Sequence, residues 1–157
     1  MDTSRTILLV EDNEDDAFLT TRALREAGIT HRIEHYHDGQ AVIAHLQDIL
    51  AMATSGGENV FPDLILLDLK LPRLGGLETL QWIRNHGAFR SLVVLALTSS
   101  TEPRDVATAY RLQINAYLVK PSSLREMVLL ACSIRAFWLD QKHFIRPSLP
   151  QSLSFAN

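Results

Sequence analysis

The sequence predicts an α/β fold in which a parallel sheet is covered by helices on both faces. Five apolar, strand-like runs alternate with five helix-like segments and are joined by short links. Most of the runs are continuously apolar, as in strands buried on both faces. The 157 residues, 46% hydrophobic and 21% charged, fit one ordinary folded domain and exclude a collagen, a coiled coil or a disordered chain. We expect a domain over 1–140 and a C-terminal extension over 141–157 that is too short for a second domain.

The first strand and helix give the clearest pattern. Residues 7–10 form an apolar run that ends abruptly in Glu11-Asp12-Asn13. Apolar residues then recur at helical spacing over 15–27, and Gly28 follows as a helix end. The next elements are expected in chain order: a weaker strand over 31–36, a helix over 40–50 and a loop over 51–62.

The second half repeats the strand–helix order three times. The third strand ends in an acid, Asp68, as the first strand does, and the fourth ends in the hydroxyl of Thr98. Pro103 suits the first turn of a helix, and Ser122 or Ser123 suits the cap of the last one. These elements are expected as strands over 64–68, 92–98 and 115–119, and as helices over 77–86, 103–112 and 122–140.

Charge and composition exclude several functions. Fifteen Lys and Arg against eighteen Asp and Glu give a formal net charge of −3, with no basic recognition element for nucleic acid. The single cysteine, Cys132, excludes an intramolecular disulfide and a multi-cysteine metal site, and favours a reducing compartment. No apolar run approaches the roughly 18 residues of a membrane span, and the polar N-terminus is not a signal peptide. We expect a cytoplasmic protein.

The expected ligand site lies beyond the carboxyl ends of the strands. In a flavodoxin-like order, 2-1-3-4-5, the first and third strands are neighbours at the point where strand order reverses. Glu11, Asp12 and Asp68 then converge, and their repulsion calls for a divalent cation such as Mg²⁺. Lys120 and Thr98 add a positive charge and a hydroxyl. This combination stabilises phosphoryl transfer and indicates that Asp68 is a nucleophile that becomes an acyl phosphate.

The same residues carry a family resemblance over about 6–140. Leu8-Leu9-Val10-Glu11-Asp12-Asn13, Asp68 with Leu71-Pro72 and Gly75-Gly76, Thr98-Ser99-Ser100, and Tyr117-Leu118-Val119-Lys120-Pro121 resemble the receiver domain of two-component response regulators.

That resemblance implies a role for each matching position. Asp68 accepts a phosphoryl group from a histidine kinase, so the protein is a phosphoacceptor and not an enzyme. Mg²⁺ or Mn²⁺ is held by Asp12, Asp68 and the main-chain carbonyl of Lys70, with Glu11 assisting through water. The resemblance also implies phosphoryl-binding and switch residues and a cis bond in the last motif. These are Thr98, Ser99, Tyr117 and Lys120, with the cis bond before Pro121.

A finer resemblance concerns the partner. The Asp15-Asp16 opening of the first helix, the long loop over 51–62 and the lack of an output domain are similar to small regulators paired with cyanobacterial and bacterial phytochromes. This implies a phytochrome as the sensor kinase and a phosphotransfer or effector protein downstream. Lys70, two residues past the acceptor, stands at a position that influences phosphoryl lifetime in the family.

The last helix indicates a contact surface. At about 100° per residue, a core-facing stripe runs from Leu124 to Trp138. Leu129, Leu130 and Phe137 lie off that stripe, which favours a homodimer through the fourth helix, fifth strand and fifth helix. The alternative is that the tail, with Phe144, Ile145 and Leu149, folds back over these side chains.

Single features of the sequence argue against three other interpretations. A phosphorylation-independent adaptor keeps the fold but usually loses some of the acidic cluster. A Mg²⁺-dependent aspartyl phosphohydrolase needs an acid two residues past Asp68, where this chain has Lys70. His31, His35 and His37 show no carboxylate or cysteine pattern of a zinc site, so we expect packing or polar roles for them.

Overall fold

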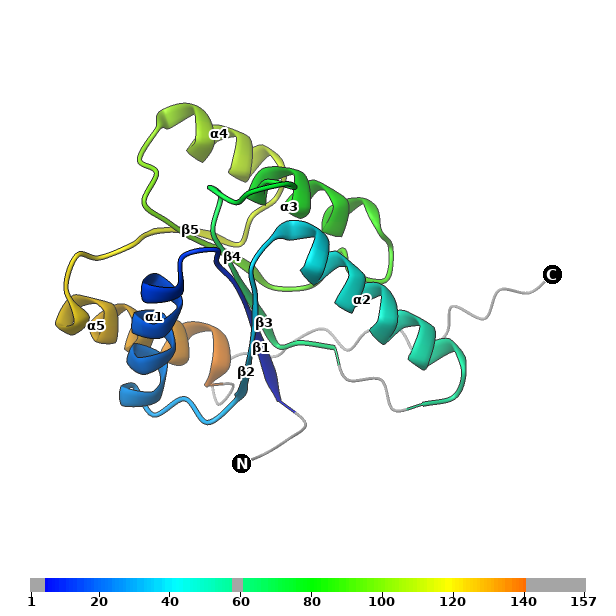
Figure 1. Cartoon of the computed structure of the whole chain (residues 1–157), viewed down its shortest axis with the longest axis horizontal. Helices are drawn as coiled ribbons and strands as arrows, with labels where there is room; N and C mark the ends of the chain where they lie inside the picture. The colour runs from blue at the N-terminus through cyan, green and yellow to red at the C-terminus, as the bar shows by residue number, and fades with distance from the viewer. Residues whose placement is uncertain (1–4, 58–60, 141–157) are drawn as a thin grey trace.

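The computed structural model describes residues 5–57 and 61–140 and contains one five-stranded parallel sheet in the order β2-β1-β3-β4-β5 (Figure 1). The flavodoxin-like α/β fold predicted from the sequence is therefore confirmed. The strands are β1 Thr6–Val10, β2 Arg32–Tyr36, β3 Leu64–Leu67, β4 Val94–Thr98 and β5 Ala116–Val119. The helices are α1 Glu14–Glu26, α2 Gly39–Thr54, α3 Gly76–Asn85, α4 Pro103–Arg111 and α5 Leu124–Ile134, followed by a π-helical turn, η1, over Arg135–Leu139.

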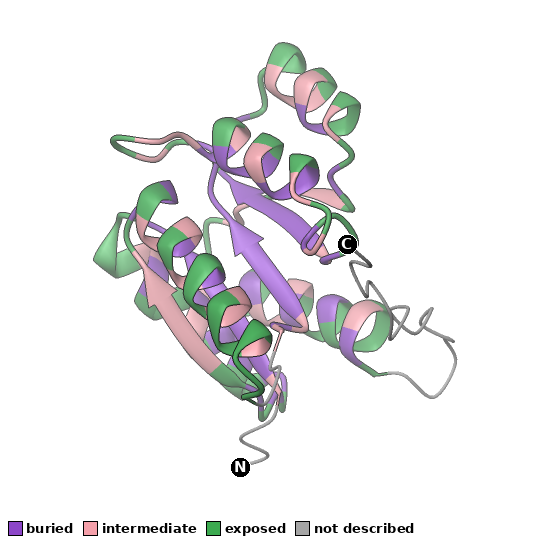
Figure 2. Cartoon of the chain, turned by 90° about the vertical axis from the view of Figure 1, so that its right-hand side faces the viewer, coloured by how far each residue is buried: buried purple, intermediate pink, exposed green. Residues whose placement is uncertain are grey.

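Each face of the sheet has its own layer of helices. Helices α1 and α5 pack together on one face, whereas α2, α3 and α4 cover the other (Figure 1). Alternate residues of β1 supply the two cores: Ile7 and Leu9 face α1 and α5, and Leu8 and Val10 face α2 and α3. The three inner strands are buried throughout, and Figure 2 shows the exposed helix surfaces outside them.

Side chains placed at helix starts explain where several helices begin. Asn13 accepts a hydrogen bond from the backbone N–H of Asp16 at 2.9 Å, and Asp38 accepts one from Ala41 at 2.8 Å. Of the two expected caps for the last helix, Ser123 caps it by accepting from the N–H of Glu126 at 3.2 Å.

Helix α2 extends further than the sequence predicted. Residues 51–54, expected in a loop, form its last turn because alanine and methionine are strong helix formers. The chain leaves the helix at Ser55 and turns at Gly56, whose φ of +85° suits glycine. The expected loop is therefore shorter than 51–62.

The buried Arg84 links α3 to the loops that precede β4 and β5. Its guanidinium donates to the carbonyls of Arg90, Leu92 and Gln113, at 3.1, 2.8 and 3.1 Å. It also donates to the side-chain oxygen of Asn115 at 2.8 Å, and that oxygen in turn accepts from the N–H of Val94. A single charged side chain thus satisfies the polar groups where two strands begin.

The predicted extension over 141–157, including the apolar residues expected to fold back, lies outside the described residues. In the part of the chain that the structure describes, no helix has both the length and the apolar character needed to cross a membrane.

Candidate functional site

Three carboxylates converge at the carboxyl edge of the sheet. Glu11 directly follows β1 and Asp68 directly follows β3, and these strands are paired with Val10 opposite Leu67. One carboxylate oxygen from each of Glu11, Asp12 and Asp68 lies within 4.8 Å of the others. Glu11 and Asp68 are buried, whereas Asp12 is exposed. Such a set of hard oxygen donors fits a divalent cation such as Mg²⁺ or Mn²⁺.

Lys120 enters this cluster from the end of β5. Its Nζ donates to Asp68 Oδ2 and to Asp16 Oδ2, each at 2.9 Å, and it also pairs with Glu11. Burial alone would lower the pKa of Lys120, but the carboxylates of Glu11, Asp16 and Asp68 overcome that effect and hold the pKa above its usual range. Lys120 is therefore a fixed positive charge beside Asp68.

The pKa of Glu11 is strongly perturbed. Burial raises this pKa and the contacts with Lys120 and with the N–H of Asn13 offset the rise only in part, so the pKa lies at about 7 instead of 4.5. The main chain here is also held, because the N–H of Glu11 donates to the carbonyl of Tyr36 at 2.9 Å. In addition, His35 Nε2 lies 2.6 Å from the carbonyl oxygen of Glu11.

The carboxylate of Asp68 is fixed from two sides. Oδ2 accepts from Lys120, and Oδ1 accepts from the backbone N–H of Lys70 at 3.1 Å. The side chain of Lys70 turns outward, with Nζ 3.3 Å from Asp105 Oδ2. Close behind the Asp68 side chain, an added Cβ at Gly76 would lie 2.2 Å from the carbonyl oxygen of Asp68, so glycine permits the approach of α3.

A hydrogen-bonded group connects the end of β4 to β5. Thr98 is fully buried and its hydroxyl accepts from the N–H of Ser100 at 3.3 Å, whereas Ser99 is exposed. The hydroxyl of Tyr117 donates to the carbonyl of Ser100 at 2.9 Å. Ser100 Oγ donates to Asp105 Oδ2 at 2.6 Å, and this contact is the largest of the influences that lower the pKa of Asp105. A chain of contacts through Ser100 and Asp105 therefore connects Tyr117 to Lys70.

The peptide bond before Pro121 differs from the expected one. The described residues contain no cis peptide bond, so the expectation of a cis bond at this position was wrong. A trans bond is the lower-energy form before proline by about 0.5–1 kcal/mol. The N–H of Lys120 still donates to the carbonyl of Thr98 at 2.8 Å, which keeps the lysine beside the site.

The three side chains expected off the core stripe of the last helix differ in their exposure. Leu129 and Phe137 are exposed, at 62% and 55%. Leu130, however, is half-buried against the core under α1 and α5, so its expected place off the core stripe was wrong. It lies three residues after Met127 and four before Ile134, both buried, and these spacings share one helix face.

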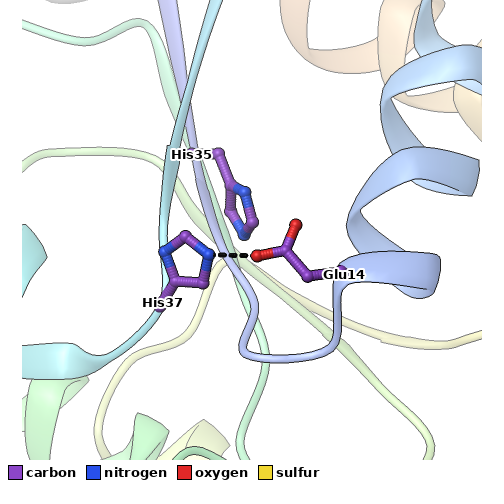
Figure 3. A group of neighbouring side chains, drawn as sticks. All are labelled: Glu14, His35 and His37. Carbon is purple, nitrogen blue, oxygen red and sulfur yellow. Dashed lines mark hydrogen bonds and ion pairs between the residues drawn. The ribbon is translucent and has the colours of Figure 1, made fainter.

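The structure also gathers residues that the sequence analysis did not connect. Asp16, in the first turn of α1, reaches Lys120 across 104 residues of chain. Glu14, in the same turn, lies beside His35 and His37 (Figure 3). The sequence contained one indication of these contacts, the position of the acidic first turn. Because this turn directly follows β1, it starts at the edge of the sheet where the carboxyl ends of the strands lie.

Comparison with known proteins gives a consistent result. A family model described as the response regulator receiver domain matches residues 7–131. The probable methanogenesis regulatory protein FilR2 of Methanothrix harundinacea is 39% identical over 133 residues, covering 85% of this chain and 83% of that protein. Response regulator Rcp1 of Synechocystis sp. is 35% identical over 136 residues, covering 87% and 90% of the two chains.

Solved structures resemble this one over most of its length. The Mn²⁺-bound form of Rcp1 matches with a TM-score of 0.73 and 32% identity, covering 91% of this chain and 99% of that one. The phosphorylated cyanobacterial phytochrome response regulator RcpA matches with a TM-score of 0.69 and 32% identity, covering 87% and 94%.

Proposed function

The chain belongs to the response regulator receiver family, and from that membership we propose that it accepts a phosphoryl group from a sensor histidine kinase on Asp68. The observation that carries the proposal is the setting of this carboxylate. Asp68 is buried at the end of β3, is held by Lys120 and by the N–H of Lys70, and lies within reach of two further acids.

The acid cluster is the proposed site of a divalent cation, Mg²⁺ or Mn²⁺. Asp12, Asp68 and the main-chain carbonyl of Lys70 would hold it, and Glu11 would assist through water. The fit rests on three oxygen donors within 4.8 Å of one another and on the excess negative charge around them. When bound, the cation supplies Lewis-acid stabilisation of charge on the phosphoryl oxygens.

The transfer step needs no separate general base. A carboxylate oxygen of Asp68 attacks phosphorus, the P–N bond to the kinase histidine breaks, and the electron pair of that bond stays with the imidazole. Lys120 keeps its proton and stabilises the negative charge of the phosphoryl group. The exposed hydroxyl of Ser99, at the same edge of the sheet, is a further proposed phosphoryl contact.

The switch is proposed to run from Thr98 to the surface of α4 and β5. The phosphoryl group draws the Thr98 hydroxyl toward it, which weakens its hydrogen bond with the N–H of Ser100. Tyr117 holds the carbonyl of the same residue, and Ser100 Oγ holds Asp105 on α4. A local change of charge is thus passed to two elements of the surface. In this arrangement Tyr117 needs no inward rotation to reach Ser100.

The output is proposed to be a protein contact made by the domain over 1–140. Leu129 and Phe137 on the exposed side of α5 and η1 are the apolar candidates for a homodimer or an effector face through α4, β5 and α5.

The partner kinase is proposed from a relative of this chain. RcpA is named a phytochrome response regulator, and we therefore propose a phytochrome as the partner kinase, in the cytoplasm. A downstream phosphotransfer or effector protein would receive the signal.

The chain is proposed to act as a signalling phosphoacceptor and not as a turnover enzyme. A phosphohydrolase needs a proton donor two residues past the nucleophile, and Lys70 at that position turns outward to Asp105. A constitutive adaptor remains the second candidate, since the exposed apolar side chains of Leu129 and Phe137 would be available to a partner whether or not Asp68 is phosphorylated.

Intact mass after incubation with Mg²⁺ and a small phosphodonor tests the proposal. The native chain should gain one acid-labile phosphoryl group and Asp68→Asn should gain none, whereas Asp15→Asn, an exposed acid of α1, should behave as the native chain. Adduct formation in Asp68→Asn would refute the assignment. No adduct from either the phosphodonor or a phosphorylated phytochrome kinase would favour the constitutive adaptor. Light scattering on the same samples tests the dimer, which a mass of one chain in both states would exclude.

A further inference from the structure

A second group of metal-ligand side chains lies near the acid cluster but outside it. Glu14 is the first residue of α1, His35 is in β2, and His37 follows the end of β2. One ligand atom from each lies within 4.8 Å of the others. Figure 3 shows the carboxylate of Glu14 directed from α1 toward the two imidazole rings.

The contacts within the group hold both rings in place. His37 Nε2 pairs with Glu14 Oε1, and the two ring centroids are 4.3 Å apart with an interplanar angle of 36°. His35 Nε2 lies 2.6 Å from the carbonyl oxygen of Glu11, so this nitrogen carries the proton of a neutral ring. The other ring nitrogen of His35 then carries the lone pair. A neutral imidazole with one free lone pair is the form of histidine that binds a metal.

The donor set differs in kind from that of the acid cluster. Two imidazoles and one carboxylate form a known zinc ligand set with an open fourth position, whereas Mg²⁺ prefers oxygen donors alone. Ligand atoms about 2 Å from one metal in a tetrahedral site lie about 3.3 Å apart, so only small shifts are needed of ligand atoms that already lie within 4.8 Å of one another. The side chains of His37 and Glu14 are 57% and 74% exposed, so little packing opposes such shifts.

The surrounding charge favours a cation. Glu14, Asp15 and Asp16 form an acidic first turn of α1. Among the residues that the structure describes, no lysine or arginine forms an ion pair with Glu14. An ordinary surface ion pair between His37 and Glu14 is the competing interpretation, and the experiment below separates the two.

We propose that Glu14, His35 and His37 bind one divalent transition-metal cation of the zinc class, separately from the acid cluster. Such a cation ties the start of α1 to the end of β2. It therefore braces the loop of Glu11, Asp12 and Asn13 that lies between β1 and α1.

Calorimetric titration of the tag-free full chain with Zn²⁺, in excess Mg²⁺, tests the proposal. We expect one Zn²⁺ per chain, with a Kd raised about 10-fold or more in Glu14→Gln and in His37→Gln. His45→Gln is the matched control, because His45 pairs with Glu34 at 3.3 Å but belongs to no three-ligand group among the residues that the structure describes. It should leave the Kd unchanged, as should Asp12→Asn, which weakens the acid cluster.

Four results would overturn the proposal. The first is no binding when Zn²⁺ is at 100 times the protein concentration, and the second is an unchanged Kd in both Glu14→Gln and His37→Gln. The third is loss of Zn²⁺ binding in Asp12→Asn while those two variants bind as the native chain does. The fourth is a loss of Zn²⁺ affinity in His45→Gln equal to that in the two test variants. Both test positions are exposed, and circular dichroism checks that each variant is folded. If one of the pair does not fold, the other decides.

Discussion

Replacing Lys120 with methionine removes a cation that contacts three carboxylates at the site. The side chain of Lys120 is only 10% exposed, and those of Glu11 and Asp68 are 3% and 5% exposed. Methionine keeps the length of the side chain and removes its charge. Two buried carboxylates are then left facing each other without a lysine between them.

The size of the loss follows from these contacts. Unit charges 2.9 Å apart, as for Lys120 and Asp68, attract by about 6 kcal/mol at an effective dielectric constant of about 20, and the cost of desolvation cancels part of this. Asp16 adds less because its side chain is 42% exposed and solvent screens it. Removing one partner of a buried pair costs about 3–5 kcal/mol. We expect about 3 kcal/mol at pH 8, since Glu11 can take up a proton and relieve the repulsion.

Urea unfolding followed by circular dichroism measures this loss. At pH 5.5 the loss should be about half as large, because Glu11, whose pKa is about 7, is protonated there in both proteins. At pH 8, Mg²⁺ at about 100 times its Kd adds about 2.7 kcal/mol and should recover most of the loss. Lys70→Met, which removes a lysine that is 61% exposed, is the control and should change the unfolding free energy by less than about 0.5 kcal/mol. A loss below about 1 kcal/mol at pH 8, or one equal to that of the control, would refute the reasoning.

Three further predictions concern Glu11, Gly76 and Arg84. The pKa of Glu11 is raised from 4.5 to about 7 on folding, so its contribution to stability falls by about 3 kcal/mol as pH rises through that window; urea unfolding of metal-free Glu11→Gln should lack this slope, and parallel pH profiles would contradict it. Gly76→Ala should lower the unfolding free energy by about 1–3 kcal/mol because its Cβ meets backbone atoms of Asp68 and Leu69, whereas Gly87→Ala, in open space, should not; equal effects on the thermal midpoint would count against the steric argument. Arg84→Leu leaves three carbonyls without their donor and should cost about 3 kcal/mol in chemical denaturation, with Arg84→Lys recovering less than half; full recovery by lysine would show that charge alone matters.

Much of the fold could be predicted because its strongest signals are local. A continuous apolar run that ends in an acid identifies both a buried strand and its functional end, as at Val10-Glu11 and Leu67-Asp68. The 2-1-3-4-5 order then brings those two ends together. Helix limits were less accurate, since the last turn of α2 depends on where Gly56 can reverse the chain.

The contacts that the sequence did not predict depend on the rotation of helices about their axes. Which side of the first turn of α1 faces Lys120, and which faces His37, is set by how α1 packs on β1 and α5. The same applies to Leu130, whose half-buried place follows from the width of the buried face of α5. The bond before Pro121 depends on a small energy difference that composition does not reveal.

Because Lys120 is synthesised after the acids that it contacts, this contact has a consequence for folding during synthesis. A ribosome synthesises Glu11, Asp12 and Asp68 before Lys120, which follows Asp68 by 52 residues. While this last stretch is still missing, a nascent chain that pairs β1 with β3 gathers its carboxylates without their lysine. Protons or a divalent cation must balance that charge in the meantime. A divalent cation from the cell would thus stabilise this intermediate until Lys120 has been made.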